Sequence, residues 1–287
     1  MEQQYIIENT ENFNLKHIFE CGQCFRWNKQ EDESYIGVIK NNVIQVKEQC
    51  GEIVFKGVCE GNLKDICIDY FDLNSDYSQI KSELSKIDEN MANSIKYGYG
   101  IRILHQDIWE TLISFIISAN NNIPRIKAII EKMSKQYGKE IAYQGKKYYT
   151  FPTPKKLKIA TVADLRLLGM GFRDKRVYDT TQLVLQNKID LYNLENENTN
   201  IVREKLLDLP GVGPKVADCI MLFALKKYEV FPIDVWVRRV INELYIKNDD
   251  EKRINKTEIE KLAKEKYGNL AGLAQQYLFY WRRKQGA

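Results

Sequence analysis

The sequence predicts an α+β fold, with an antiparallel β-sheet lobe and flanking helices at residues 1–100 and a mostly helical, two-lobed body at residues 101–287. Three short runs of β-branched residues, separated by turn-forming residues, occupy the first third of the chain. From about Asn62, apolar residues recur at spacings of three and four, which is typical of amphipathic helices. The chain has 287 residues, 44% hydrophobic and 29% charged, and is long enough to bury a full core.

The three β-branched runs are expected to form consecutive strands at Tyr35–Lys40, Val43–Lys47 and Ile53–Val58. Asn41-Asn42 and the Gln49–Glu52 stretch supply residues that favour turns between them. Because the connections are so short, the strands are predicted to pair as an antiparallel meander.

The first helix of the body is expected to begin at Asp107, whose carboxylate suits an N-cap, and to end near the polar run Asn120-Asn121-Asn122. A second helix follows from about Pro124 to Tyr137, and the segment 138–154 predicts a loop or a small hairpin. Further helices are expected at 161–168, 173–187, 200–208, 214–226, 235–246, 256–266 and 269–284.

The N-terminus lacks the basic and apolar regions of a secretory signal, and no apolar run approaches the roughly 18–20 residues of a membrane span. We therefore expect an intracellular, cytoplasmic protein with reduced cysteines and no membrane partner. The net charge of +4 is compatible with a nucleic-acid partner without requiring one. Cys21 and Cys24 form a CxxC, which can mean a redox pair, half a zinc site, or small residues in a tight turn. The turn is favoured because neither His17 nor His105 has ligand spacing, so no metal site is expected.

The most informative stretch is LPGVGPK at residues 209–215, which lies between an amphipathic helix and an apolar helix. Gly211 and Gly213 permit a tight reversal and a close approach of another backbone, and Pro214 suits the first helical turn. Backbone N–H groups at such a turn can hold a DNA phosphate. The hairpin, at about residues 200–226, resembles the helix-hairpin-helix motif, which is moderately specific for DNA backbone binding. A corner between two helices with no ligand is the alternative.

Lys215 indicates chemistry at this hairpin. It occupies the first turn of the outgoing helix, where the positive end of the helix dipole disfavours a cation. Lysine amines form Schiff bases at electrophilic carbons, so a catalytic role is one interpretation. A phosphate-binding or exposed lysine is the other.

Asp234 follows nineteen residues later, in FPIDVWV at residues 231–237, and precedes an amphipathic helix. It suits an N-cap. A capping carboxylate is held rigidly and can also stabilise a developing positive charge near Lys215 and manage protons.

Together, LPGVGPKVADCIMLFAL and FPIDVWV resemble the helix-hairpin-helix, Gly/Pro-rich, Asp superfamily of base-excision DNA glycosylases, and within it the bacterial 8-oxoguanine DNA glycosylases. The resemblance extends from CGQCFRW near residue 21 to AGLAQQYLF near residue 271. It implies that Lys215 attacks the deoxyribose C1′ to form an imine and that Asp234 assists. The implied activity is that of a DNA N-glycosylase with lyase activity at abasic sites.

The resemblance also implies residues that read the damaged base. Gly22 matches the glycine whose carbonyl accepts the N7–H that 8-oxoguanine has and guanine lacks. Gln275 matches the amide that reads the Watson–Crick edge. Cys219 and Phe279 match the pair that sandwiches the flipped base. Without the resemblance, a core role is the simpler interpretation of Cys219 and Phe279, and a solvated position that of Gln275.

A further set of residues is implied to contact the DNA. Asn120 matches the asparagine that fills the space left by the extruded base, and Arg125 and Arg173 match arginines that contact the opposite cytosine. Phe172 and Trp236 depart from the eukaryotic pattern, which has a tyrosine wedge and a phosphate-binding histidine at these positions. The departures resemble the bacterial branch and put the strength of opposite-base discrimination in doubt.

The implied partner is double-stranded DNA containing 8-oxoguanine, bound by a monomer, with no redox cofactor and no catalytic metal. Three alternatives remain open at this point. One is a glycosylase for oxidised pyrimidines, although such members carry four cysteines for an iron–sulfur cluster after the catalytic Asp, and this chain has none after Cys219. The others are a non-enzymatic DNA-binding protein built on the hairpin and a CxxC thiol oxidoreductase.

Overall fold

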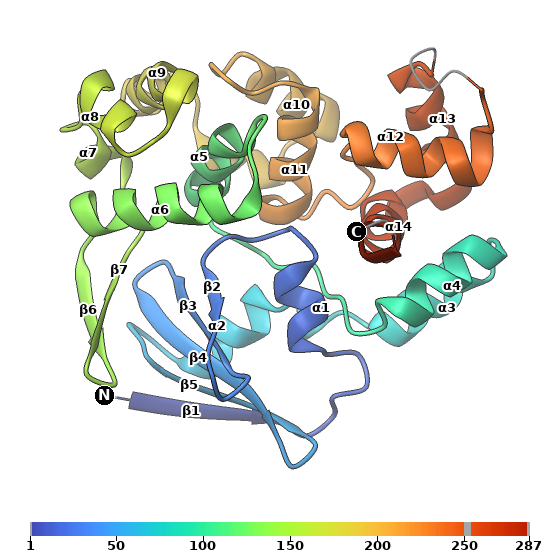
Figure 1. Ribbon diagram of the computed structural model, residues 1–287, viewed down its shortest axis with the longest axis horizontal. Helices are drawn as coiled ribbons and strands as arrows, with labels where there is room; N and C mark the ends of the chain where they lie inside the picture. Colours follow the sequence, from blue (N-terminus) through green and yellow to red (C-terminus); the bar gives the residue numbers. More distant parts are fainter. Residues whose placement is uncertain (1, 250–253, 286–287) are drawn as a thin grey trace.

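The computed structural model describes residues 2–249 and 254–285 and has the expected α+β architecture. An antiparallel sheet, with α1 (Leu15–Glu20) and α2 (Leu63–Tyr70) beside it, forms one end of the molecule, and the helices from α5 (Ile108–Ser118) onward form the other (Figure 1). The sheet has five strands in the order β1-β5-β4-β3-β2. Their bounds are β1 Glu2–Ile7, β2 Trp27–Lys29, β3 Tyr35–Ile39, β4 Asn42–Gln49 and β5 Glu52–Val58.

The three strands expected from the β-branched runs are confirmed as β3, β4 and β5, each within two residues of its expected bounds. Their connections are tight, with positive φ at Lys40 in the first and at Cys50 and Gly51 in the second. Strand β2 was not predicted, and neither was β1, which pairs with β5 along the edge of the sheet. Alternate residues of β1 are exposed, so its apolar signal is weak.

Both faces of β3 are buried, because different elements cover them. Helices α1 and α2 share one hydrophobic cluster with Tyr35 and Ile39. On the other face, Ile36 and Val38 pack with Tyr143. Tyr143 belongs to a hairpin, β6 Glu140–Tyr143 and β7 Lys146–Tyr149, that reaches from the helical body alongside the sheet (Figure 1). The segment 138–154, expected as a loop or small hairpin, therefore ties the body to the lobe.

The helices expected in the body are present. Asp107 caps α5 by accepting a hydrogen bond from the Glu110 backbone N–H at 2.9 Å. The helix expected at 235–246 is α-helical only to Ile241 and continues as a π-helical turn, η3. The bounds are α5 Ile108–Ser118, α6 Ile123–Tyr137, α7 Pro154–Leu157, α8 Val162–Leu167, η1 Gly171–Arg173, α9 Asp174–Leu185, η2 Leu191–Asn196, α10 Thr199–Leu207, α11 Pro214–Ala224, α12 Val235–Ile241, η3 Asn242–Ile246, α13 Lys256–Tyr267, η5 Gly268–Leu270 and α14 Ala271–Gln285.

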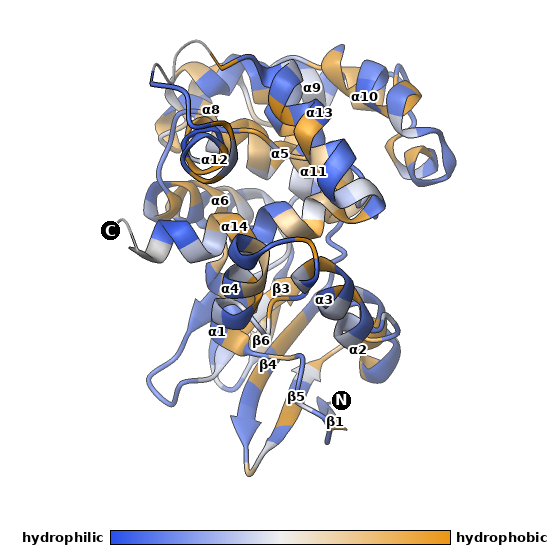
Figure 2. Ribbon diagram, turned by 90° about the vertical axis from the view of Figure 1, so that its right-hand side faces the viewer, coloured by the Kyte–Doolittle hydropathy of each residue, from blue (hydrophilic) through white to orange (hydrophobic). Residues whose placement is uncertain are grey.

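The main core lies among the helices, and two helices from the first 100 residues contribute to it. Helices α3 (Tyr77–Ser85) and α4 (Glu89–Tyr97) place Leu84 and Met91 in the same cluster as α5, α11 and α14. Apolar residues gather where these helices meet, and polar residues face outward (Figure 2). Helix α14 is thereby held between α4 and α12. In the part of the chain that is described, no helix combines the length and apolar character needed to cross a bilayer.

Candidate active site

A cavity of about 420 Å³ lies where five segments meet: the loop after α1, the α5–α6 junction, the start of α11, the start of α12, and α14. It brings together five of the residues singled out in the sequence, which are Gly22, Lys215, Asp234, Trp236 and Phe279. These residues span more than 250 positions of the chain. The rest of the lining is Phe25, Phe115, Ser118, Asn121, Asn122, Ile123, Pro124, Ile126 and Arg283.

Lys215 enters the cavity from the first turn of α11 and is half-buried. Gly213 is the N-cap of this helix and Pro214 is its first residue, as the spacing predicted. The lysine Nζ lies 5.0 Å from the centre of the Phe115 ring. Cys219 follows Lys215 by four positions, so both lie on the same face of α11.

Asp234 is the N-cap of α12, as its position before the helix predicted. Its Oδ1 accepts a hydrogen bond from the backbone N–H of Val237 at 2.8 Å. The same carboxylate lines the cavity with Lys215. The capping hydrogen bond fixes the orientation of the carboxylate within the cavity that it shares with Lys215.

Cys219 is fully buried, and this burial raises the pKa of its thiol to about 11. The neighbouring Lys215 acts in the opposite direction, while Asp218 and Asp234 raise the pKa further. The thiol therefore stays protonated and neutral near pH 7, so it is a small polarisable group rather than a nucleophile, and it does not itself line the cavity.

Gly22 faces the ring of Phe279. The backbone of Gly22 has a φ of +92°, which disfavours any side chain, and a Cβ there would lie 3.5 Å from Phe279 Cε1. Gln275 lies one turn before Phe279 on α14 but does not line the cavity. It is 4% exposed, and its Oε1 accepts a hydrogen bond from Gln276 Nε2 at 2.9 Å.

The helix-hairpin-helix geometry expected at residues 200–226 is formed by α10 and α11. Gly211 has a φ of +87°, and a Cβ there would lie 2.9 Å from Arg176 Cδ and 3.1 Å from Ile116 Cγ2. Gly213 differs, because no atom comes within 4 Å of its Cβ position and the residue is exposed. Gly211 thus shapes the turn, while Gly213 leaves its outer surface open for another backbone.

The other predicted DNA contacts gather in two loops beside the cavity. Asn120 has a φ of +50° and does not line the cavity, whereas Asn121 and Asn122 do. Arg173 is only 3% exposed, and its guanidinium donates hydrogen bonds to the backbone carbonyls of Ala119 at 2.7 and 2.5 Å and Asn120 at 2.6 Å. Phe172 is 52% exposed beside it. Arg173 therefore joins the loop that carries Asn120 to the loop that carries Phe172.

Arg125 takes part in the same assembly from the first turn of α6. Its backbone N–H donates to the side chain of Asn122 at 3.0 Å, and its Nη2 donates to the carbonyl of Gly169 at 3.1 Å. The side chain is exposed, so its remaining donors face outward.

Sequence reasoning missed several lining residues, of which Arg283 has the clearest chemistry. It lies four positions after Phe279, so helical periodicity alone would have placed both on one face of α14. Phe25 and Phe115 were missed for a different reason. Each belongs to an apolar segment that also fills the core, and only the packing shows which aromatic ring reaches the cavity.

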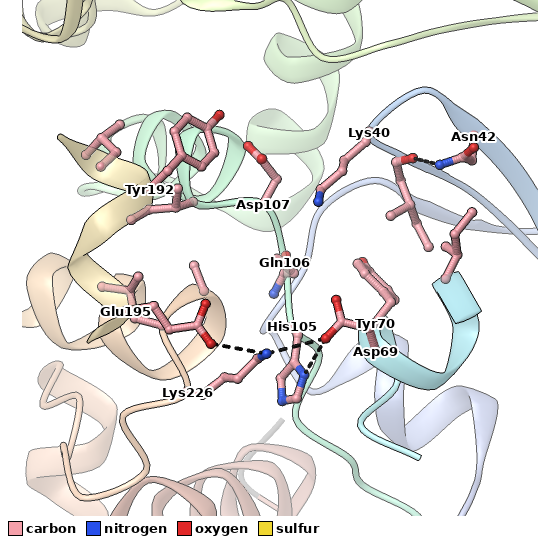
Figure 3. Close-up of a pocket in the computed structure, with 16 residues that line it drawn as sticks. Lys40, Asn42, Asp69, Tyr70, His105, Gln106, Asp107, Tyr192, Glu195 and Lys226 are labelled. Atoms are coloured by element: carbon pink, nitrogen blue, oxygen red, sulfur yellow. Dashed lines mark hydrogen bonds and ion pairs between the residues drawn. The ribbon is translucent and has the colours of Figure 1, made fainter. Parts of the chain in front are cut away.

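A second cavity, of about 200 Å³, lies between α2, η2 and the segment entering α5, and Figure 3 shows its lining. Its charged groups are largely paired with one another. Lys226 Nζ lies 3.4 Å from Asp69 Oδ1 and 3.2 Å from Glu195 Oε1 (Figure 3). None of the site residues singled out in the sequence lines it. We therefore assign the candidate chemistry to the cavity that contains Lys215.

The burial of the CxxC thiols disfavours the redox interpretation of this motif. Cys21 and Cys24 are buried free thiols, and burial raises the pKa of both, that of Cys21 to about 12. A thiol oxidoreductase needs the opposite shift. Across residues 2–249 and 254–285, no group of His, Cys, Asp and Glu side chains is arranged to hold a metal ion.

Two family matches divide the chain. Residues 5–112 match the 8-oxoguanine DNA glycosylase N-terminal domain, and residues 113–267 match the HhH-GPD superfamily of base excision DNA repair proteins. The second match begins within α5 and includes Lys215 and Asp234.

Relatives that cover most of the chain agree with these matches. A probable N-glycosylase/DNA lyase of Methanothermobacter thermautotrophicus is 32% identical over 75% of this chain and 73% of its own. The N-glycosylase/DNA lyase of Saccharomyces cerevisiae is 33% identical over 83% of this chain and 69% of its own. Among solved structures, the Clostridium acetobutylicum 8-oxoguanine glycosylase/lyase in complex with double-stranded DNA containing cytosine opposite 8-oxoG has a TM-score of 0.93. It is 43% identical, covering 100% of this chain and 99% of that one.

Proposed function

We propose a function on one premise: the chain belongs to the HhH-GPD superfamily of base excision DNA repair proteins. It is a DNA N-glycosylase with lyase activity at the abasic site, and it removes 8-oxoguanine from double-stranded DNA. The observation that carries this proposal is the cavity shared by Lys215, Asp234, Gly22 and Phe279. It occurs in a chain whose residues 5–112 match the 8-oxoguanine DNA glycosylase N-terminal domain.

Lys215 is the proposed nucleophile. The damaged nucleotide leaves the helical stack and enters the cavity, because C1′ is out of reach inside a duplex. The neutral amine attacks C1′, the C1′–N9 bond breaks, and the base departs with the bonding electron pair and takes up a proton. The C1′–O4′ bond of the sugar then opens and O4′ takes up a proton, which leaves C1′ doubly bonded to the lysine nitrogen as the imine. The imine makes the C2′ proton acidic, so its loss expels the 3′ phosphate by β-elimination.

Asp234 is the proposed electrostatic partner. Cleavage of the C1′–N9 bond builds positive charge on the sugar, and a fixed carboxylate in the same cavity stabilises that charge without having to reorganise. Its hydrogen bond from the Val237 N–H supports this role, because it holds the carboxylate in place before the substrate arrives.

Four residues are proposed to select the base. The Gly22 carbonyl accepts the N7–H that only the oxidised base presents, whereas guanine would bring a lone pair against it. Phe279 and the neutral thiol of Cys219 cover the two faces of the base. Gln275 reads the Watson–Crick edge, which requires it to exchange its present contact with Gln276 for the base.

The remaining predicted contacts position the DNA. The Gly211–Gly213 turn binds the backbone, Asn120 fills the vacated space, and Phe172, Arg125 and Arg173 face the opposite base. Trp236, two residues after Asp234, also lines the cavity. We further propose that the protein acts as a monomer on the chromosome, in the cytoplasm and associated with the nucleoid.

The test is borohydride trapping on a labelled duplex with one 8-oxoguanine opposite cytosine, beside the undamaged duplex. We expect a covalent protein–DNA adduct with the lesion duplex only, because reduction converts the imine to a stable amine. Lys215→Gln should bind the lesion duplex and form no adduct. Lys64→Gln, which removes an exposed lysine from α2, outside the hairpin and the cavity, should trap like wild type.

If Lys215→Gln formed the adduct or cleaved the strand as wild type does, Lys215 would not be the nucleophile. If the wild-type protein binds the lesion duplex but forms no adduct, two explanations remain: a glycosylase without lyase activity, or a DNA-binding protein without enzymatic activity. Release of free base, measured without strand cleavage, separates these two outcomes.

A further inference from the structure

Arg283 is a second cation in the cavity, and the proposed chemistry does not use it. Its guanidinium carbon lies 5.8 Å from the centre of the Phe279 ring, and its Nη1 lies 3.3 Å from where a Cβ of Gly22 would be. Within residues 2–249 and 254–285, no hydrogen bond or ion pair engages this guanidinium. A guanidinium carries five N–H donors, so Arg283 has donors available to a ligand.

Arg283 lies about two helical turns further along α14 than the buried Gln275. Gln275, Phe279 and Arg283 follow one another at intervals of four, so they form one stripe along the helix. Gln275 is buried and outside the cavity lining, whereas Phe279 and Arg283 are both partly exposed and line it. A base that stacks on Phe279, with its Watson–Crick edge toward Gln275, would have its sugar and phosphates on the side of Arg283.

The charge of Arg283 favours a phosphate over the base as its ligand. A donor beside Gly22 would attract the bare N7 of normal guanine, and this would oppose the discrimination proposed for the Gly22 carbonyl. A phosphate carries a full negative charge and matches the forked geometry of a guanidinium. Lys215 and Arg283 are the only basic side chains among the described residues that line the cavity, and Trp236, which also lines it, is uncharged.

We propose that Arg283 binds a phosphate next to the flipped nucleotide and so holds the sugar over Lys215. This assignment rests on the proposed function, because it requires a nucleotide in the cavity. It makes Arg283 a positioning residue that acts independently of which base occupies the site.

The experiment measures binding to a duplex with a tetrahydrofuran abasic analogue, which has the phosphates but neither a base nor a cleavable bond. Arg283→Gln is expected to weaken binding roughly tenfold. It should also lower the slope of log K against log salt concentration by about one, because one phosphate contact is lost. Arg283→Lys should keep the slope. Lys64→Gln, which removes an exposed charge from α2, should bind like wild type.

Single methylphosphonates, which remove the charge of one phosphate at a time, locate the contact. A methylphosphonate at one position next to the abasic analogue should lower the affinity of the wild-type protein to that of Arg283→Gln. The same methylphosphonate should leave the affinity of Arg283→Gln unchanged. If Arg283→Gln weakens binding to an 8-oxoguanine duplex only, the contact is with the base and the proposal is overturned. Unchanged affinity and slope for both duplexes would overturn it as well. The analogue contains no 8-oxoguanine, so the two proposals can fail separately. If Arg283→Gln weakens binding to the analogue but the wild-type protein gives no borohydride adduct, only the proposed function is rejected.

Discussion

The carboxylate of Asp234 accepts a hydrogen bond from the backbone N–H of Val237 at 2.8 Å while it lines the cavity that contains Lys215. One side chain thus starts a helix and presents a charge to the proposed reaction centre. The two roles can be separated, because asparagine caps a helix about as well as aspartate but carries no charge.

We predict that Asp234→Asn keeps the stability of the protein and loses most of its base-release rate. The expected loss is on the order of 10²- to 10⁴-fold, the range for removal of a positioned catalytic group. Asp234→Ala should lose the rate and also about 1 kcal/mol of stability, since the cap is gone. Single-turnover base release and urea unfolding measure the two effects. A near-normal rate in Asp234→Asn would reduce Asp234 to a cap.

The two glycines of the hairpin should respond differently to alanine. Gly211→Ala puts a Cβ at 2.9 Å from Arg176 Cδ on a backbone with a φ of +87°, so we expect a loss of about 1–3 kcal/mol. Gly213→Ala meets open space and should change stability by less than about 0.5 kcal/mol. Thermal unfolding checks both values. If Gly213→Ala binds DNA as wild type does, Gly213 is not where the DNA backbone approaches.

Arg173 should contribute to stability as well as to DNA binding, because its buried guanidinium holds the carbonyls of Ala119 and Asn120. A lysine cannot reach both loops, so Arg173→Lys is expected to cost about 2–4 kcal/mol. Phe172→Ala, at an exposed position in the adjoining loop, should cost less than about 1 kcal/mol. Urea unfolding provides the comparison. An Arg173→Lys protein of normal stability but altered preference for the opposite base would indicate a direct base contact instead.

His17 should make stability depend on pH. Burial, with a smaller contribution from Lys16, lowers its pKa to about 4, and its Nδ1 accepts a hydrogen bond from the Gly100 N–H at 3.2 Å. The unfolded chain takes up this proton near pH 6.5, so it binds more protons than the folded state between about pH 6.5 and 4. The stabilisation is therefore complete above about pH 6.5 and is lost as the pH falls through 4.

We expect about 1 kcal/mol from His17, reduced from the full linkage value because the side chain is only half-buried. Urea unfolding near neutral pH and near pH 5 should show a larger acid loss for wild type than for His17→Gln. His105 remains as the other histidine in both proteins. Parallel losses in the two proteins would assign the acid sensitivity elsewhere.

The sequence predicted a structural feature correctly where the residues that determine it lie within one short segment. Asp107 and Asp234 are caps because each carboxylate bonds to a backbone N–H three residues away. The strands β3 to β5 were found because tight turns and β-branched runs define a meander locally. Strand β1 was missed because an edge strand with alternate exposed residues carries little apolar signal, and its partner β5 is about 50 residues away.

The sequence by itself determined the chemical groups of this protein: the α+β class, the hairpin, its lysine, and the capping aspartate that follows. Only the tertiary structure decided which groups share a cavity. Helix α14 packs between α4 and α12. This packing places Phe279 in the same cavity as Gly22 and as Lys215 at the start of α11. The same packing buries Gln275, whereas Arg173 is buried against the loop that follows α5, where it bonds to the carbonyls of Ala119 and Asn120. Such outcomes depend on long-range contacts, which periodicity and spacing along one segment cannot encode.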